Sequence, residues 1–178
     1  MNGCSGVQLR RFIVSFVAIE PGHIAAELIV NATPETVFAI LADPTTHAAI
    51  DRTENVRASI DQVRITEAGQ LFRMAMYHDG HPDKHYKIAN LVEVFDEPRA
   101  IAWKPGTESS EIGEVSYGGW VWRYDLEAVG PAQTTVTLTY DWSGLTPEAR
   151  AVQKFPPFGM DYLELSLQHL SEQATAAS

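Results

Sequence analysis

The densest group of side chains that could do chemistry lies between residues 77 and 85. Its sequence, YHDGHPDKH, contains three histidines and two aspartates, whose nitrogen and oxygen atoms are ligands that Zn²⁺ and other divalent metals use. Gly80 and Pro82 lie among them, and both residue types are typical of a turn between two strands. The spacing matches no known metal-ligand pattern. We therefore expect an exposed hairpin here, without a metal.

Other catalytic arrangements are mostly absent from the sequence. There is no G-x-S-x-G nucleophile elbow, no P-loop and no G-x-G-x-x-G motif after a strand, so the sequence indicates no cofactor. Asp125, Glu127 and Asp141 alternate with apolar residues and are expected on the water-facing side of their strands. Arg73 and Arg123 face outward by the same alternation, which weakens them as clamps for a substrate.

The elements that must position any site begin with a strand over residues 23–30 and two short helices. Thr33 is a suitable N-cap, and Pro34 suits the first position of the helix that follows. Asp43-Pro44 ends this helix, because the residue before a proline avoids the helical conformation. A second short helix is expected over residues 45–50.

A regular alternation of apolar and polar residues follows and predicts an antiparallel sheet with one covered face. The expected strands cover residues 70–78, 86–95, 100–103, 120–127 and 135–142. In the second of these, Val92 and Val94 are expected on the covered face. Apolar residues at intervals of three and four over residues 157–174 predict a helix that lies on the sheet. The fold class is therefore α+β.

The covered face is rich in methionine, tryptophan and tyrosine, which suit an irregular apolar ligand. The candidate ligand-binding residues are Met74, Met76, His78, Ile88, Asn90, Trp103, Trp120, Trp122, Tyr124, Tyr140, Phe158 and Tyr162. The same stripe also suits a plain core without a cavity. Asn90 either meets a ligand or makes a structural hydrogen bond, directly or to a bound water, and His78 either lines the site or lies exposed at a strand end.

The longest connection between strands covers residues 105–119. It carries four glycines and three glutamates, which predict a mobile acidic flap. We expect this flap to gate entry to any cavity.

Charge and composition exclude several classes of function. The 178 residues include 13 Lys+Arg and 23 Asp+Glu, so the net charge is −10, and neither a nucleic acid nor an anionic membrane is an expected partner.

Residues 1–22 partly resemble a signal peptide, but Glu20-Pro21-Gly22 interrupts the apolar run. We expect a poorly packed extension and no membrane span. The single cysteine, Cys4, favours a cytoplasmic protein without a disulfide.

Five stretches follow one another in an order typical of one superfamily: ATPETVFAILADPTTHAAID, GQLFRMAMY, VEVFDEPRAIAWKP, GGWVWRYDLEAV and TTVTLTYDWSGL. This succession resembles the SRPBCC superfamily, the START-like or Bet v 1-like helix-grip proteins, and more narrowly its bacterial polyketide cyclase/dehydrase group. The resemblance implies a curved sheet of about seven antiparallel strands around a long C-terminal helix, with a hydrophobic ligand cavity between them. It also implies a single domain over residues 23–174, followed by a tail over residues 175–178.

The resemblance favours a protein that binds a hydrophobic or aromatic small molecule, lipid-like or polyketide-like, without chemistry of its own. The first alternative is an enzyme of the cyclase, aromatase or dehydratase type. His78 and the hydroxyls of Tyr124, Tyr140 or Tyr162 would then exchange protons with a bound carbonyl compound. The second alternative is a protein-interaction module without a ligand, like the chaperone activators of the superfamily. Fold membership alone does not select among the three.

Overall fold

The computed structural model describes residues 15–20, 22–51, 53, 55–109, 111–152, 154–159 and 161–178. The strands in this part of the chain are β1 (Ser15–Glu20), β2 (His23–Val30), β3 (Val56–Ser59), β4 (Leu71–Tyr77), β5 (His85–Asp96), β6 (Ala100–Glu108), β7 (Val115–Tyr117), β8 (Val121–Gly130) and β9 (Gln133–Asp141). Its helices are α1 (Pro34–Leu41), the short 3₁₀ helix η1 (Pro44–Thr46), α2 (His47–Ile50), α3 (Pro147–Val152) and α4 (Asp161–Ala176).

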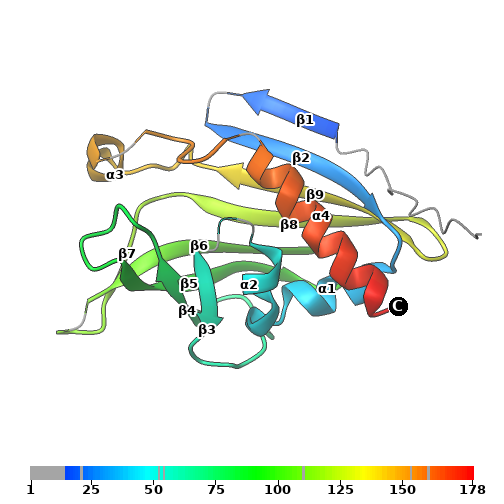
Figure 1. Ribbon diagram of the computed structural model, residues 1–178, viewed down its shortest axis with the longest axis horizontal. Coiled ribbons are helices and arrows are strands. Elements are labelled where there is room, and N and C mark those ends of the chain that lie inside the picture. The colour runs from blue at the N-terminus through cyan, green and yellow to red at the C-terminus, as the bar shows by residue number, and fades with distance from the viewer. Residues whose placement is uncertain are drawn as a thin grey trace, which may run out of the picture.

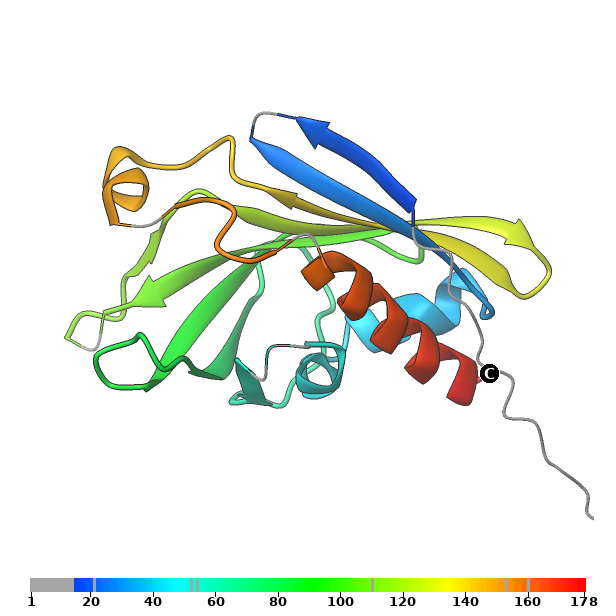
Figure 2. The same ribbon diagram turned by 45° about the horizontal axis from the view of Figure 1, so that its top comes forward.

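The strands form one antiparallel sheet in the order β1-β2-β9-β8-β6-β5-β4-β3, and β7 pairs with the end of β6. The sheet curls, and α1, α2 and α4 lie on its concave side, whereas α3 lies apart at one end (Figures 1 and 2). The predicted α+β class, the curved antiparallel sheet, the long C-terminal helix and the short helices that follow residues 23–30 are confirmed. Strands β1, β3 and β7 are additional to the strands expected from the sequence.

Helix α1 begins where the sequence predicts. The Thr33 hydroxyl accepts a hydrogen bond from the Thr36 N–H at 3.3 Å, and Pro34 occupies the first turn. The chain leaves this helix before Asp43, whose carboxylate accepts a hydrogen bond from the Thr45 N–H at 3.0 Å and so caps η1. These local interactions bring α2, the next helix, against β3.

The hydrophobic core lies between α4 and the sheet. Leu163, Leu167 and Leu170 of α4 are fully buried and share one cluster with the inward side chains of β2. The helix starts at Asp161, four residues later than expected, and residues 155–158 form bends before it. An aspartate in the first turn also suits the positive end of the helix dipole.

A β-bulge in β5 overturns the expected inward position of Val94. Val92 lies opposite Trp103 on β6, but Val94 lies opposite Ala102, so one extra residue of β5 is inserted between them. The insertion reverses the faces of the residues that follow. Phe95 therefore joins the core and packs edge-on against Phe38 of α1, with ring centroids 5.2 Å apart.

The expected flap over residues 105–119 is largely a β-hairpin, which corrects our interpretation of its composition. Strand β6 continues to Glu108, and Gly106, Thr107 and Glu108 pair with Tyr117, Ser116 and Val115 of β7. Pro105 lies where β6 changes partner from β8 to β7, so its missing N–H falls between the two ladders. Gly113 takes the positive φ of +69° that the turn requires. Gly113 therefore allows a tight turn between two strands and does not indicate a mobile loop.

Part of the expected N-terminal extension is an edge strand. Ser15–Glu20 pairs with β2 in antiparallel register, with a bulge between Phe16 and Ala18. Residues 1–14 lie outside the described residues, as does Cys4. The division into an extension, one domain and a tail stays a prediction.

Candidate functional site

The concave face of the sheet, together with the start of α4 and the segment before it, gathers almost all of the predicted ligand-binding residues. Met74 lies opposite Ile88, and Trp103 lies opposite Trp122 on the next strand. The buried members are Met74, Asn90, Trp103, Tyr124 and Tyr140. The members that pack against the core but stay partly accessible are Met76, Ile88, Trp120, Trp122, Phe158 and Tyr162. Large apolar side chains that face inward and yet remain accessible mark a surface that a ligand could cover.

One half of this surface is an aromatic cluster. Trp122 lies 4.4 Å from Tyr140, 5.5 Å from Phe158 and 5.7 Å from Tyr162, measured between ring centroids. Phe158 and Tyr162 are 4.5 Å apart. The cluster joins strands β8 and β9 to the start of α4, so it lies at one end of the helix.

A second aromatic group lies further along the sheet, beneath α2. The His47 imidazole stacks on Trp103 at 5.1 Å and meets Phe72 edge-on at 5.5 Å. Trp103 in turn lies 5.8 Å from Tyr124. The His47 Nε2 is 2.9 Å from the Leu41 carbonyl oxygen, and because that partner only accepts, Nε2 carries the proton and donates. Burial lowers the pKa of His47, so the ring is neutral.

Two buried polar atoms, one on the sheet and one on α4, have no hydrogen-bond partner among the described residues: Asn90 Oδ1 and Ser166 Oγ. Asn90 is 2% exposed, and its Nδ2 makes one long contact of 3.4 Å to the Phe72 carbonyl oxygen. That carbonyl must face the amide nitrogen, so Oδ1 is the atom that remains unpaired. An unpaired buried acceptor costs about 1–3 kcal/mol, which a water or a ligand group would recover.

Asp51 brings a negative charge to the same face. Its Oδ1 accepts a hydrogen bond from the Tyr162 hydroxyl at 2.7 Å, and its Oδ2 accepts one from the Val56 N–H at 3.0 Å. Burial, and then the charge of Asp51, raise the pKa of Tyr162, Tyr124 and Tyr86 above the usual value. The carboxylate therefore binds the phenol of α4 directly and acts on those of β5 and β8 through its charge.

Ser166 follows Tyr162 by one helical turn. The residue is 3% exposed, and its hydroxyl lies close enough to the Tyr162 oxygen to oppose the rise in the pKa of that phenol. Among the described residues, no partner of this hydroxyl lies in hydrogen-bonding geometry. A hydroxyl can donate or accept, so Ser166 suits ligand groups of either kind.

His78 does not lie with the other candidates. It is exposed in the turn between β4 and β5, where its Nδ1 accepts a hydrogen bond from the Gly80 N–H at 3.1 Å. Strand β4 ends at Tyr77, one residue before the alternation would place His78 inward. Within the described part of the chain, no three His, Cys, Asp or Glu side chains gather closely enough to hold a metal ion.

Three residues of the site were missed by the sequence analysis: His47, Asp51 and Ser166. His47 and Asp51 sit in and just after the short second helix, whose small size gave no clear periodic face. Ser166 lies four residues after Tyr162, and this spacing on the predicted helix was a signal that could have placed it beside that tyrosine.

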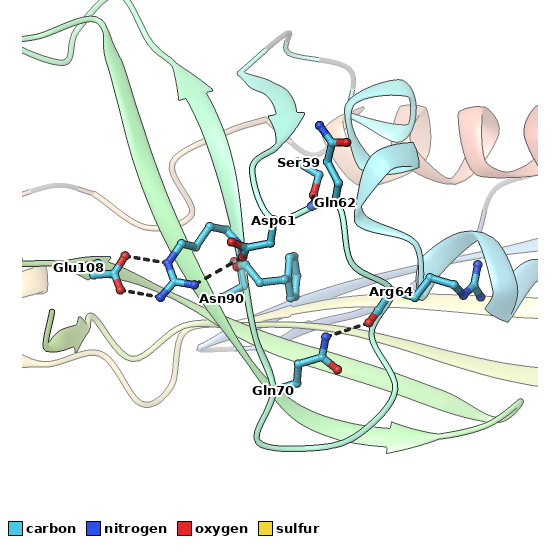
Figure 3. A network of polar contacts seen from close by, with 9 residues as sticks. Ser59, Asp61, Gln62, Arg64, Gln70, Asn90 and Glu108 are labelled. Atoms are coloured by element: carbon cyan, nitrogen blue, oxygen red, sulfur yellow. Dashed lines mark hydrogen bonds and ion pairs between the residues drawn. The ribbon is translucent and has the colours of Figure 1, made fainter.

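The cations of the described chain lie outside this face. Arg73 donates from Nη2 and Nε to Glu108 at 2.6 and 2.8 Å, and its Nη1 lies 3.5 Å from Asp61 (Figure 3). Arg123 pairs with Asp125, and Lys104 pairs with Glu93. The predicted outward direction of Arg73 and Arg123 is consistent with these pairs. The remaining described lysines and arginines are exposed.

His47 should make stability depend on pH. Its folded pKa lies below the unfolded value of 6.5, so below that pH the unfolded chain binds more protons and the free energy of unfolding falls. We expect a slope of at most about 1.4 kcal/mol per pH unit that His47→Gln removes. Urea unfolding between pH 5 and 7 measures it for both proteins. Equal slopes would show that His47 does not titrate on unfolding.

No protein-family model matches the chain. An uncharacterised protein of Mycobacterium tuberculosis, from strains CDC 1551 and H37Rv, is 29% identical over 143 and 142 residues, respectively. The match includes 79% of this chain, which spans 57% of the length of that relative.

Solved structures settle the fold. The Mycobacterium smegmatis protein Ms6760 superposes with a TM-score of 0.65 at 14% identity, covering 94% of this chain and all of that one. Norcoclaurine synthase of Thalictrum gives 0.59 at 10% identity, with 94% and 98% covered. Ginseng major latex-like protein 151 gives 0.55 at 16% identity, with 88% and 96% covered. The chain has the Bet v 1-like helix-grip fold. In the described part of this helix-grip chain, no helix is both long and apolar enough to span a bilayer.

Proposed function

We propose that the chain is an SRPBCC protein, close to the bacterial polyketide cyclase/dehydrase group, that binds a hydrophobic or aromatic small molecule between the sheet and α4. The observation that carries this proposal is the set of accessible aromatic and methionine side chains on the concave face, next to the unpaired buried Asn90 Oδ1. A plain core would exclude water from these side chains and satisfy this acceptor. The single cysteine supports a cytoplasmic location.

Adjacent residues of β5 offer a matched test. Ile88 is partly buried on the concave face, whereas Lys87 is exposed on the opposite face. Ile88→Trp should weaken binding of the neutral fluorescent probe N-phenyl-1-naphthylamine at least tenfold, because the indole occupies the ligand's place. Lys87→Trp should leave the affinity unchanged. A titration of probe fluorescence measures both. The proposal fails if the wild type does not bind the probe, or if the two variants bind it equally well.

A second candidate function, catalysis of the cyclase or dehydratase type, draws support from the Asp51–Tyr162 contact. A carboxylate that accepts a hydrogen bond from a phenol can pass a proton to or from a bound carbonyl compound. Tyr124 and Tyr140 are weaker candidates, since among the described residues we find no carboxylate bonded to either hydroxyl, whereas Tyr162 donates to Asp51. A ligand released chemically unchanged after incubation supports the binding protein, whereas a converted ligand supports the enzyme. Native mass spectrometry that finds no copurified ligand would favour the interaction module.

A further inference from the structure

Two polar groups at this site, Asn90 Oδ1 and the Asp51 carboxylate, are hydrogen-bond acceptors. Asn90 Oδ1 is buried and unpaired, and its position between Ile88 and Val92 of β5 directs it toward the interior. The Phe72 carbonyl fixes the amide so that the oxygen, and not the nitrogen, is free. A ligand atom that meets Oδ1 must therefore carry a hydrogen. An ether, a ketone or a carboxylate would leave two acceptors facing each other.

The charge on this face has the same sign. Asp51 holds its carboxylate toward Tyr162 through a hydrogen bond of 2.7 Å, and its two oxygens also accept from Thr53 and from the Val56 N–H. The described lysines and arginines are exposed or engaged in ion pairs on the outer face, so within the described residues none of them balances this charge. An anionic ligand that approached the Asp51 carboxylate would be repelled by it.

We propose that the site selects an aromatic molecule that bears a neutral hydrogen-bond donor, such as a phenol or an alcohol, and rejects the corresponding carboxylate. Asn90 Oδ1 accepts from the donor, and Asp51 supplies the repulsion against anions. Fatty acids and aromatic acids are thereby poor ligands, and hydroxylated aromatic compounds are good ones. This inference rests on the proposed function, because it names the ligand class of that same site.

Three compounds that share a naphthalene ring and differ in one substituent test the inference directly. The probes are 2-naphthol, 2-methylnaphthalene and 2-naphthoate, each measured by displacement of N-phenyl-1-naphthylamine. We expect 2-naphthol to bind at least fivefold more tightly than 2-methylnaphthalene, although the methyl compound is the more apolar. We expect 2-naphthoate to bind at least tenfold more weakly than 2-naphthol.

Two variants assign these preferences to residues. Asn90→Leu keeps a similar volume and should abolish the advantage of 2-naphthol over 2-methylnaphthalene. Asp51→Asn keeps one acceptor oxygen, which can serve the Val56 N–H, and turns its NH2 group toward the Tyr162 hydroxyl, whose oxygen can accept from it. This substitution should reduce the rejection of 2-naphthoate at least fivefold. Circular dichroism and thermal unfolding confirm that each variant is folded.

The outcomes separate this inference from the function on which it rests. If the wild type binds 2-methylnaphthalene or 2-naphthoate as tightly as 2-naphthol, the ligand class is wrong while the proposed binding function stands. If the wild-type preferences persist unchanged in both variants, Asn90 and Asp51 do not cause them and the inference is likewise wrong. If neither the fluorescent probe nor any of the naphthalenes binds, the proposed function fails as well.

Discussion

Replacing Leu167 with alanine is expected to lower the free energy of unfolding by about 2–5 kcal/mol. Leu167 lies in the middle of α4, is fully buried and belongs to the cluster that joins this helix to the sheet. The substitution removes apolar contacts and leaves a cavity that the surrounding strands can collapse only in part. Urea denaturation followed by tryptophan fluorescence measures the loss.

Leu165 provides a matched control on the same helix. It lies two residues away and is only partly buried. Leu165→Ala should lower the free energy of unfolding by roughly half as much as Leu167→Ala, or less. The reason is that folding removes less of the apolar surface of Leu165 from water. Similar losses for the two variants would contradict the orientation of α4 on the sheet.

Gly119→Ala is expected to destabilise the protein by about 3 kcal/mol or more. Gly119 adopts a φ of +94°, and an added Cβ would overlap the Gly144 carbonyl oxygen and lie 2.6 Å from its carbonyl carbon. Both obstacles are backbone atoms, which cannot rotate away. The Thr146 N–H donates to the Gly118 carbonyl oxygen at 3.0 Å, so the substitution would also strain the contact between these two loops.

Gly69 separates the steric part of this effect from the conformational part. Its φ of +88° is similar, but an added Cβ would meet no atom within 4 Å. Gly69→Ala should therefore lower the free energy of unfolding by only about 1–2 kcal/mol, which is the penalty of a positive φ alone. Thermal unfolding of the two variants gives the comparison. A Gly119→Ala protein as stable as Gly69→Ala would mean that the two loops are not packed as described.

Local patterns were sufficient for most of the fold. The Thr33-Pro34 pair fixed the start of α1, and strict alternation in β8 and β9 identified their inward side chains, because these signals depend on neighbouring residues only. The inward positions of Trp122 and Tyr140 followed from the same alternation. The pattern failed where one residue breaks it, as at the bulge that brings Phe95 rather than Val94 inward.

The chemistry of the site depends on contacts that no local pattern contains. Asp51 and Tyr162 are 111 residues apart, and only the packing of α4 over α2 and the sheet brings them together. Asn90 was found because a polar residue interrupted an apolar face, but that its oxygen is the free atom depends on Phe72 of the neighbouring strand. The hairpin of β6 and β7 was missed because glycine-rich composition does not distinguish a tight turn from a loop.

The bulge separates β5 into two segments that make different contacts. Before it, Ile88 and Asn90 face the surface that we assign to the ligand, and after it, Phe95 holds α1 in place through Phe38. Because the inserted residue separates these segments, we expect substitutions before the bulge to leave the contact with α1 intact. The surface that we assign to the ligand and the contact that holds α1 thus lie on separate segments of one strand.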